Sequence, residues 1–218
     1  MNKVSLIVIT DGRQACISET IPSMRKNLNY DFYEKIIIND SADSRYHQYL
    51  VSSYPDFRVV SHETRRGLAG AVQSAWSSVS KDADYIFHLE DDFIFNKELD
   101  IDVLIELLES KDTLAQMALV RAPVNPPEEN VGGFVFQNLQ DYHQRDGFFD
   151  HQRLFTLNPS IYKKSLTDIG WPDRGGESDF TSKLHGIDGS YCFGFIGNIY
   201  DKPYVTHIGG RRSEGWFL

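Results

Sequence analysis

Three consecutive acidic residues, Glu90-Asp91-Asp92, are the first candidates for chemistry in this chain. They follow an apolar segment, residues 84–89, that has the composition of a buried strand. In open parallel sheets, ligands bind just beyond the carboxyl ends of the strands. Alternate carboxylates at that edge can hold a hard divalent cation, which in turn neutralises a diphosphate. The alternative interpretation is a solvated acidic turn that caps the next helix.

Polar residues also end two earlier apolar segments. Thr10-Asp11 follows the first and Asp40 follows the second, so a parallel sheet would bring both to the edge that carries the acidic triplet. Asp40 could accept hydrogen bonds from a ribose or a base edge, although Asp is also a common turn former. Arg65-Arg66-Gly67 precedes a predicted helix, where backbone donors and guanidinium groups suit an anion. An exposed basic turn is the alternative there.

The elements that must position these residues alternate between strand and helix in the first half of the chain. Continuous apolar or β-branched runs predict strands, and helical spacing of apolar residues predicts helices. Pro22 places the regular part of the first helix after that residue. The alternation implies crossover connections and a mostly parallel sheet. The predicted strands are 4–10, 35–39, 57–61, 84–89 and 118–121, and the predicted helices are 17–28, 67–79 and 101–110.

The second half of the chain has a different character. Residues 123–133 are rich in Pro, Gly, Asn and Glu, and residues 137–152 are polar with little periodicity. A loop as long as 123–152 in a compact domain is usually a lid or a binding loop. Order returns at Phe155, with a predicted helix over 178–184 and a strand over 204–206. No repeat or linker divides the chain, which predicts one domain over residues 1–218.

Composition excludes several classes of protein. The 218 residues are 41% hydrophobic and 24% charged, as in an ordinary globular protein rather than a disordered chain or a disulfide-rich miniprotein. A net charge of −9 argues against broad coating of nucleic acid. Cys16 and Cys192 predict two reduced thiols. No apolar run approaches the roughly 20 residues that cross a bilayer, so we expect a soluble, cytoplasmic protein.

The order of the amino-terminal segments resembles that of the GT-A glycosyltransferases, and of family 2 in particular. Residues 4–10 look like their opening strand, 36–41 like the second strand with its nucleoside-binding Asp, and 66–71 like their glycine-containing turn. Residues 84–92 are similar to the strand that carries their Asp-x-Asp motif, with Glu90 in the first acidic place. The resemblance implies that Glu90 and Asp92 hold Mn²⁺ or Mg²⁺. It also implies a donor-binding set that consists of Thr10, Asp11, Asp40, Arg66, Gly67 and Asp91.

The carboxy-terminal segments extend the resemblance. Residues 175–180 are similar to an acidic motif at the start of an acceptor-side helix, which implies Glu177 or Asp179 as general base. Glu177 is favoured because Asp179 can instead stabilise the first turn of the helix, and a simple acidic helix start is the alternative for both. Residues 205–210 look like a late strand whose His207 completes the metal site. Arg211 and Arg212, in a locally basic segment, would then clamp the diphosphate.

Together, the resemblance implies a single Rossmann-like GT-A α/β domain with a mostly parallel sheet and flanking helices. Residues 1–122 would form the nucleotide-sugar-binding half, and residues 123–218 an irregular acceptor-side and catalytic half. The implied reaction is metal-dependent transfer from a UDP- or GDP-linked sugar to an acceptor hydroxyl, with inversion. Acceptor choice would fall to loop 123–152 and to the aromatic faces of Trp171, Tyr191 and Trp216.

Three other functions fit parts of the pattern. A sugar-phosphate nucleotidyltransferase needs a glycine-rich basic loop after the first strand, for which residues 11–14 are a poor match. A non-catalytic sugar-nucleotide or carbohydrate-binding module would tolerate loss of acids that this chain retains. A transferase that modifies hydroxylated bases in nucleic acid stays open, because a local groove could offset the net acidity.

Overall fold

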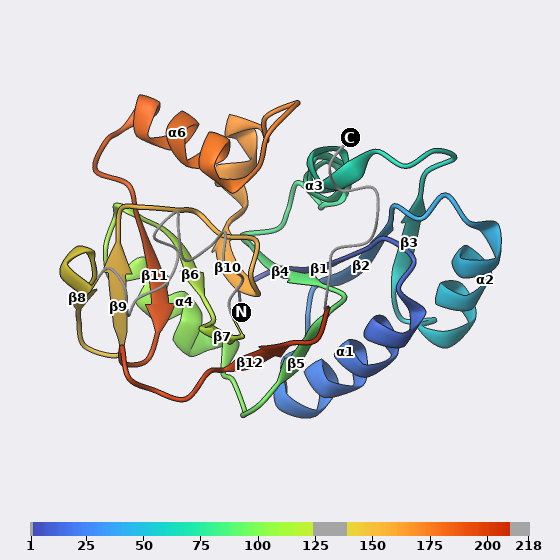
Figure 1. Ribbon diagram of the computed structural model, residues 1–218, viewed down its shortest axis with the longest axis horizontal. Helices are drawn as coiled ribbons and strands as arrows, with labels where there is room; N and C mark the ends of the chain where they lie inside the picture. Colours follow the sequence, from blue (N-terminus) through green and yellow to red (C-terminus); the bar gives the residue numbers. More distant parts are fainter. Residues whose placement is uncertain (1, 124–138, 210–218) are drawn as a thin grey trace.

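A nine-stranded sheet forms the centre of the protein. The computed structural model describes residues 2–123 and 139–209, and the strands of this sheet lie in the order β3-β2-β1-β4-β10-β6-β11-β9-β8 (Figure 1). In the amino-terminal half β1 pairs in parallel with both β2 and β4, and β2 pairs in parallel with β3. These four strands are β1 (Val4–Thr10), β2 (Glu34–Asn39), β3 (Arg58–Ser61) and β4 (Tyr85–Glu90).

Strand β1 lies at the point where the order of the sheet reverses, since β2 and β4 lie on opposite sides of it. All seven of its residues are buried, as its continuous apolar sequence predicts for a strand covered on both faces. The carboxyl ends of β1, β2 and β4 meet at one edge there, which is where open α/β sheets bind ligands.

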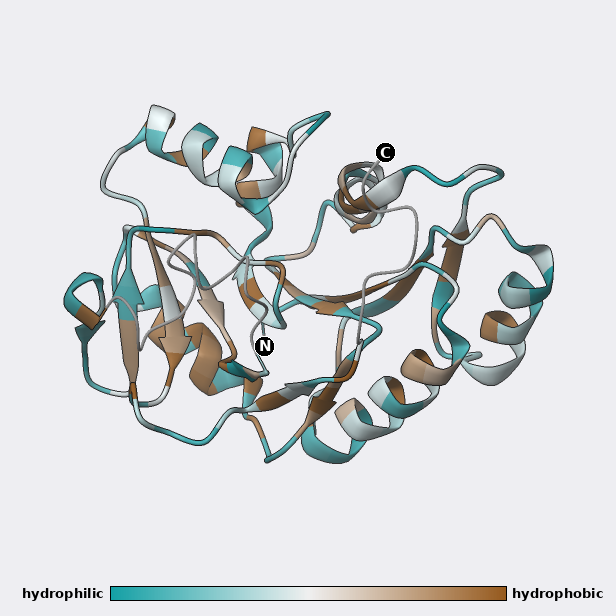
Figure 2. Ribbon diagram, viewed as in Figure 1, coloured by the Kyte–Doolittle hydropathy of each residue, from teal (hydrophilic) through white to brown (hydrophobic). Residues whose placement is uncertain are grey.

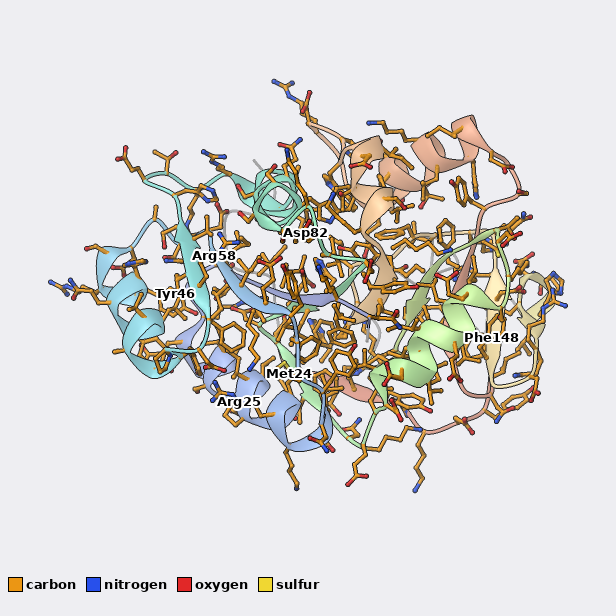
Figure 3. All side chains as sticks on the ribbon, turned by 180° about the vertical axis from the view of Figure 1, so that it is seen from behind. Met24, Arg25, Tyr46, Arg58, Asp82 and Phe148 are labelled. Atoms are coloured by element: carbon orange, nitrogen blue, oxygen red, sulfur yellow. The ribbon has the colours of Figure 1, made fainter. Side chains whose placement is uncertain are left out.

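Helices cover the two faces of the sheet and form two hydrophobic clusters. One cluster contains side chains from α1 (Gln14–Asn27), α2 (Ser44–Ser53) and α4 (Ile101–Glu109), and the other contains side chains from α3 (Gly67–Ser78) and α6 (Glu177–Ile187). Figure 1 shows α3 and α6 above the sheet, α1 below it, and α2 at the right, beyond β3. The central strands are the most hydrophobic segments in Figure 2. On α1, Met24 enters its cluster whereas the neighbouring Arg25 is exposed (Figure 3).

The carboxy-terminal half of the sheet is mixed. Strand β10 (Ser160–Lys163) runs antiparallel to both β4 and β6 (Leu114–Ala118), and β11 (Cys192–Ile196) is parallel to β6. The edge is an antiparallel pair formed by β8 (His143–Gln144) and β9 (Phe148–His151). Short 3-10 helices occupy Leu139–Asp141 and Lys164–Ile169. The fold is thus a mixed α/β domain, as the sequence predicts.

A second sheet of three short strands brings distant segments together. Strand β12 (Val205–His207) lies between β5 (Phe93–Phe95), to which it is antiparallel, and β7 (Arg121–Ala122), to which it is parallel. Its register places His207 opposite Phe93. The end of β12 therefore lies directly beside the acidic triplet.

Three local predictions are wrong. The strand expected over 118–121 covers the break between β6 and β7, because β6 ends at Ala118 and β7 begins at Arg121. The loop expected over 123–152 contains β8 and β9 in its described part, where aromatic side chains bury an otherwise polar segment. Helix α1 begins at Gln14 and continues through Pro22, because its buried face, including Ile17, Ile21 and Met24, anchors it to the sheet despite the missing N–H.

No helix among the described residues is long and apolar enough to cross a membrane. The cytoplasmic location stays a prediction.

Candidate functional site

The acidic triplet lies where β4 ends beside β1. Ile9 and Glu90 are partners in the parallel register, and the backbone N–H of Asp91 donates to the carbonyl of Ile9 (3.0 Å). The register therefore sets Asp91 and Asp92 next to Asp11, which follows β1. Asp11, Asp91 and Asp92 are all buried.

One guanidinium group donates hydrogen bonds to all three carboxylates. Arg13, from the turn between β1 and α1, donates from Nε to Asp11 Oδ1 (2.9 Å), from Nη1 to Asp92 Oδ2 (2.7 Å) and from Nη2 to Asp91 Oδ1. Burial lowers the pKa of Arg13, but the negative charges of Asp91, Asp92 and Asp11 together raise it by more, so the group stays charged. Among the described residues, three carboxylates thus share one guanidinium. We define Arg13, Asp11, Asp91 and Asp92 as the strand-end cluster.

Asp91 is an internal anchor of this cluster. Its side chain is fully buried and accepts a hydrogen bond from Thr10 Oγ1 (2.5 Å), which is also hydrogen-bonded to Tyr46 of α2 (2.7 Å; Tyr46 is labelled in Figure 3). Burial raises the pKa of Asp91 to about 7, against the opposing effect of Arg13. Thr20 Oγ1 donates to the Asp91 carbonyl (2.6 Å). Thr10 and Asp91, predicted to bind the donor, are thus used to hold the cluster in place.

Asp92 and His207 are brought together by the small sheet. His207 Nε2 lies 3.0 Å from Asp92 Oδ2, and the backbone N–H of Ile208 donates to the Asp92 carbonyl (2.8 Å). Burial would raise the pKa of Asp92, but hydrogen bonds from His207 and Arg13 hold it below its usual value. This carboxylate is therefore ionised, as a metal ligand must be.

The other oxygen of Asp92 indicates how a divalent cation could fit. Asp92 Oδ1 is buried and has no hydrogen-bond partner among the described residues, although buried polar atoms are almost always paired. Among those residues no three His, Cys, Asp or Glu side chains converge on one metal position. Mg²⁺ in enzymes is commonly held by one or two carboxylates, with substrate phosphates and water completing its shell. Asp92, with His207 beside it, fits that kind of cation site.

The backbone of Gly209 closes over the same carboxylate. A Cβ atom there would overlap Asp92 Oδ2 and lie 2.5 Å from Arg13 Nη1. Only glycine allows the chain after β12 to approach so closely.

Asp40 performs a structural task at the next strand end. Its Oδ1 and Oδ2 accept hydrogen bonds from the backbone N–H groups of Arg66 (2.8 Å) and Gly67 (2.9 Å), where α3 begins. Burial raises the pKa of Asp40, and these two hydrogen bonds oppose that effect. Gly67 adopts φ +67°, a left-handed conformation that favours glycine. Asp40 therefore fixes the turn that carries Arg66 and Gly67 near the sheet edge.

The start of α6 carries the two candidate bases. Glu177 Oε1 accepts from the backbone N–H of Leu157 (2.5 Å) and from Thr156 Oγ1 (3.1 Å). Burial raises the pKa of Glu90 well above its usual value, and the negative charges of Asp92 and Glu177 raise it further. Glu177 thus lies within electrostatic reach of the acidic triplet. Asp179 is exposed, and its Oδ2 caps the helix at the N–H of Gly176 (3.0 Å).

Two of the aromatic residues expected to contact the acceptor, Trp171 and Tyr191, pack instead against the hydrophobic core. Trp171 is only 3% exposed and stacks on Phe180 (ring centroids 4.9 Å apart), so its face is not available to a sugar. Trp171 is buried because its large apolar area packs into the hydrophobic cluster that contains the α6 side chains. Tyr191 is half-buried against the same cluster. Trp216, Arg211 and Arg212 lie outside the described residues.

Arg13 is the functional candidate that the sequence analysis missed. Its partners Asp91 and Asp92 are 78 and 79 positions away in the chain, and only the pairing of β1 with β4 brings them together. The one signal in the sequence was a basic residue three positions after the end of the first buried strand.

The arrangement of the sheet, with acids after β4 and a capped turn before α3, is that of the GT-A glycosyltransferase fold. The family model for glycosyl transferase family 2 matches residues 5–167. This chain belongs to glycosyltransferase family 2.

Solved structures support the same fold. The chain is similar to a mannosyltransferase of Pyrobaculum calidifontis in complex with GDP-Man and Mn²⁺, with 15% identity and a TM-score of 0.64 over 97% of this chain and 58% of that one. GalNAc-T7 with UDP, GalNAc and Mn²⁺ gives 14% identity and a TM-score of 0.67 over 99% and 45% of the two chains. For TarS of S. aureus the identity is 16% and the TM-score is 0.62, over 94% of this chain and 36% of that one.

The chain thus spans between 36% and 58% of the length of these three proteins. At such low identities the likeness establishes the fold alone. No curated protein matches the sequence significantly.

Proposed function

We propose that this glycosyltransferase uses a divalent cation, Mn²⁺ or Mg²⁺, to transfer a sugar from a nucleotide-sugar donor to an acceptor hydroxyl. The observation that carries the proposal is the buried, unpartnered Oδ1 of Asp92 at the carboxyl end of β4. Asp92 and His207 would hold the cation, with Glu90 nearby. When bound, the cation would stabilise the charge that develops on the departing nucleoside diphosphate.

The donor would lie along the carboxyl ends of β1 and β2. Asp11 and the turn at Arg66 and Gly67, which Asp40 fixes, border that edge. Two of the structural neighbours hold GDP-Man or UDP, which makes GDP- and UDP-linked sugars the first donors to test. Arg211 and Arg212 remain proposed diphosphate contacts.

Glu177 is our preferred general base. Its charge interacts with Glu90 at the end of β4, whereas Asp179 is exposed and caps its own helix. A base on the α6 side would remove the proton from an acceptor hydroxyl that attacks the anomeric carbon opposite the leaving group. That geometry gives a single displacement with inversion.

Thermal unfolding with nucleoside diphosphates and nucleotide sugars, with and without Mn²⁺, tests donor binding. A ligand at 100 times its dissociation constant adds about 2.7 kcal/mol of stability. We expect a Mn²⁺-dependent increase with one nucleotide, and no such increase in Asp92→Asn. If no nucleotide stabilises the wild type, the proposal is wrong.

Comparison of Glu177→Gln with Asp179→Asn tests the base. Loss of a general base lowers turnover by about 10²–10⁴-fold. We expect that loss for Glu177→Gln with donor binding retained, and near-normal turnover for Asp179→Asn. The reverse order would assign the base to Asp179. A protein that binds donor but never releases nucleoside diphosphate would be a binding module instead.

A further inference from the structure

We propose that Arg13 is the resident counter-cation of the donor site, so that a divalent cation binds weakly alone and tightly together with a diphosphate. This inference rests on the proposed function. It concerns the coupling between the two ligands rather than the reaction itself.

The contacts of Arg13 put it in competition with a cation. Its Nη1 binds Asp92 Oδ2 at 2.7 Å, so a cation on the unpartnered Oδ1 would share one carboxylate with a guanidinium group. Two positive groups on the same carboxylate repel each other. Because Asp92 is buried, water screens this repulsion only weakly. Arg13 therefore lowers the affinity of the bare site for a cation.

Arg13 cannot readily leave the site. Asp91 is fully buried and has no other cationic partner among the described residues, and an unpaired buried charge is costly. Gly209 also packs so closely that a Cβ atom would lie 2.5 Å from Arg13 Nη1. The guanidinium is thus held both by its carboxylates and by the chain after β12.

A diphosphate relieves the repulsion. Arg13 uses three of its five N–H donors on Asp11, Asp91 and Asp92, and no described residue accepts from the other two. With 23% of its side chain exposed, it can present those donors to phosphate oxygens. The negative charge of a diphosphate would then lie between the guanidinium and the cation. Binding of either ligand consequently strengthens binding of the other.

Mn²⁺ binding tests this inference without catalysis. The EPR signal of unbound Mn²⁺ measures affinity for the wild type, Arg13→Gln and Asp92→Asn, each with and without the nucleoside diphosphate that stabilises the wild type. Arg25→Gln is the matched control, since Arg25 pairs with Asp56 on the surface. Thermal unfolding confirms that each variant is folded.

For the wild type we expect about 10-fold tighter Mn²⁺ binding when the nucleotide is present. Arg13→Gln should bind Mn²⁺ alone about 10-fold more tightly than the wild type, with a smaller further gain from nucleotide than the wild type shows. Arg25→Gln should match the wild type, and Asp92→Asn should not bind.

The inference is overturned if folded Arg13→Gln binds Mn²⁺ no more tightly than the wild type. If Arg13→Gln does not fold, the wild type decides alone, because equal Mn²⁺ affinity with and without nucleotide would also overturn it. Failure of the proposed function has a different signature, in which no nucleotide binds the wild type under any condition. The comparison of Arg13→Gln with the wild type in Mn²⁺ alone would then still test the role of Arg13.

Discussion

Two clusters of charged residues, each built around buried carboxylates, lie in different halves of this protein, and their composition differs. In the strand-end cluster, Arg13 faces three carboxylates, and one oxygen of Asp92 has no partner among the described residues. In the second cluster, on β9, a single buried carboxylate, Asp150, accepts from Lys111 Nζ (2.7 Å) and from Nε and Nη2 of Arg145 (both 3.3 Å).

The difference is the one expected between the proposed ligand site and a structural ion pair. Burial would raise the pKa of Asp150, but hydrogen bonds from Lys111 and Arg145 lower it, and both of its oxygens are paired. An excess of cations satisfies Asp150 without any ligand. Among the described residues the strand-end cluster has the opposite ratio, with three carboxylates to one guanidinium.

Asp92→Asn tests the contrast with the largest expected effect. Loss of a ligand to the proposed cation should remove several kcal/mol of transition-state stabilisation, on the order of 10²–10³-fold in turnover. Stability should also fall, because Arg13 and His207 favour the ionised carboxylate in the folded protein, as its lowered pKa shows. Nucleoside diphosphate release and thermal unfolding measure the two quantities, and near-normal turnover would contradict the assignment of Asp92.

His151→Phe tests the surroundings of the second cluster. His151 is 2% exposed, stacks on Phe195, and burial lowers its pKa to about 4. The unfolded chain, with a His pKa near 6.5, binds a proton first as pH falls, so this group's contribution to stability is lost below about pH 6.5. Between pH 7.5 and pH 5 the wild type should lose about 2 kcal/mol more than the variant. Urea unfolding at both values measures this, and equal losses would show that His151 titrates normally.

Asp150→Asn should reduce stability without affecting donor binding. Hydrogen bonds to charged groups contribute about 1.5–3 kcal/mol, but the side chains of Lys111 and Arg145 are 38% and 46% exposed and can be rehydrated. We therefore expect a loss of about 1–2 kcal/mol in urea unfolding, with an unchanged thermal shift on adding nucleotide. A change in nucleotide affinity would mean that the two clusters are coupled.

Arg145→Gln should have the smallest effect. Its guanidinium is half exposed, and exposed ion pairs contribute less than about 1 kcal/mol. The free energy of unfolding should fall by less than half as much as in Asp150→Asn. An equal loss would show that Arg145, rather than Lys111, is the main partner of Asp150.

Sequence patterns were sufficient for the four parallel strands of the amino-terminal half, although helix α2 was not predicted and the start of α1 was wrong. The run over residues 4–10 matches β1 at both ends. The strand predicted over 84–89 begins and ends one residue before β4. Continuous apolar sequences bounded by polar residues define such strands because both faces are covered. The edge at which Asp11, Asp40 and Asp92 lie followed from the parallel topology.

The carboxy-terminal half was harder to predict because its strands carry no such pattern. Strand β9 buries Asp150 and His151 along with two Phe residues, so its sequence lacks the continuous apolar run that marks a buried strand. Strand β10 inserts antiparallel between β4 and β6, an order that no local spacing encodes. The role of Arg13 depends on long-range pairing in the same way, as does the burial of Trp171.

The position of β12 has a consequence for how the protein matures. Its three residues are near the end of the described chain, yet β12 supplies His207 and leads into Gly209 against Asp92. A nascent chain that has already assembled β1 to β4 still lacks His207 and Gly209 beside Asp92. The proposed cation site is therefore complete only after residue 209 has left the ribosome, even though most of the sheet can form earlier.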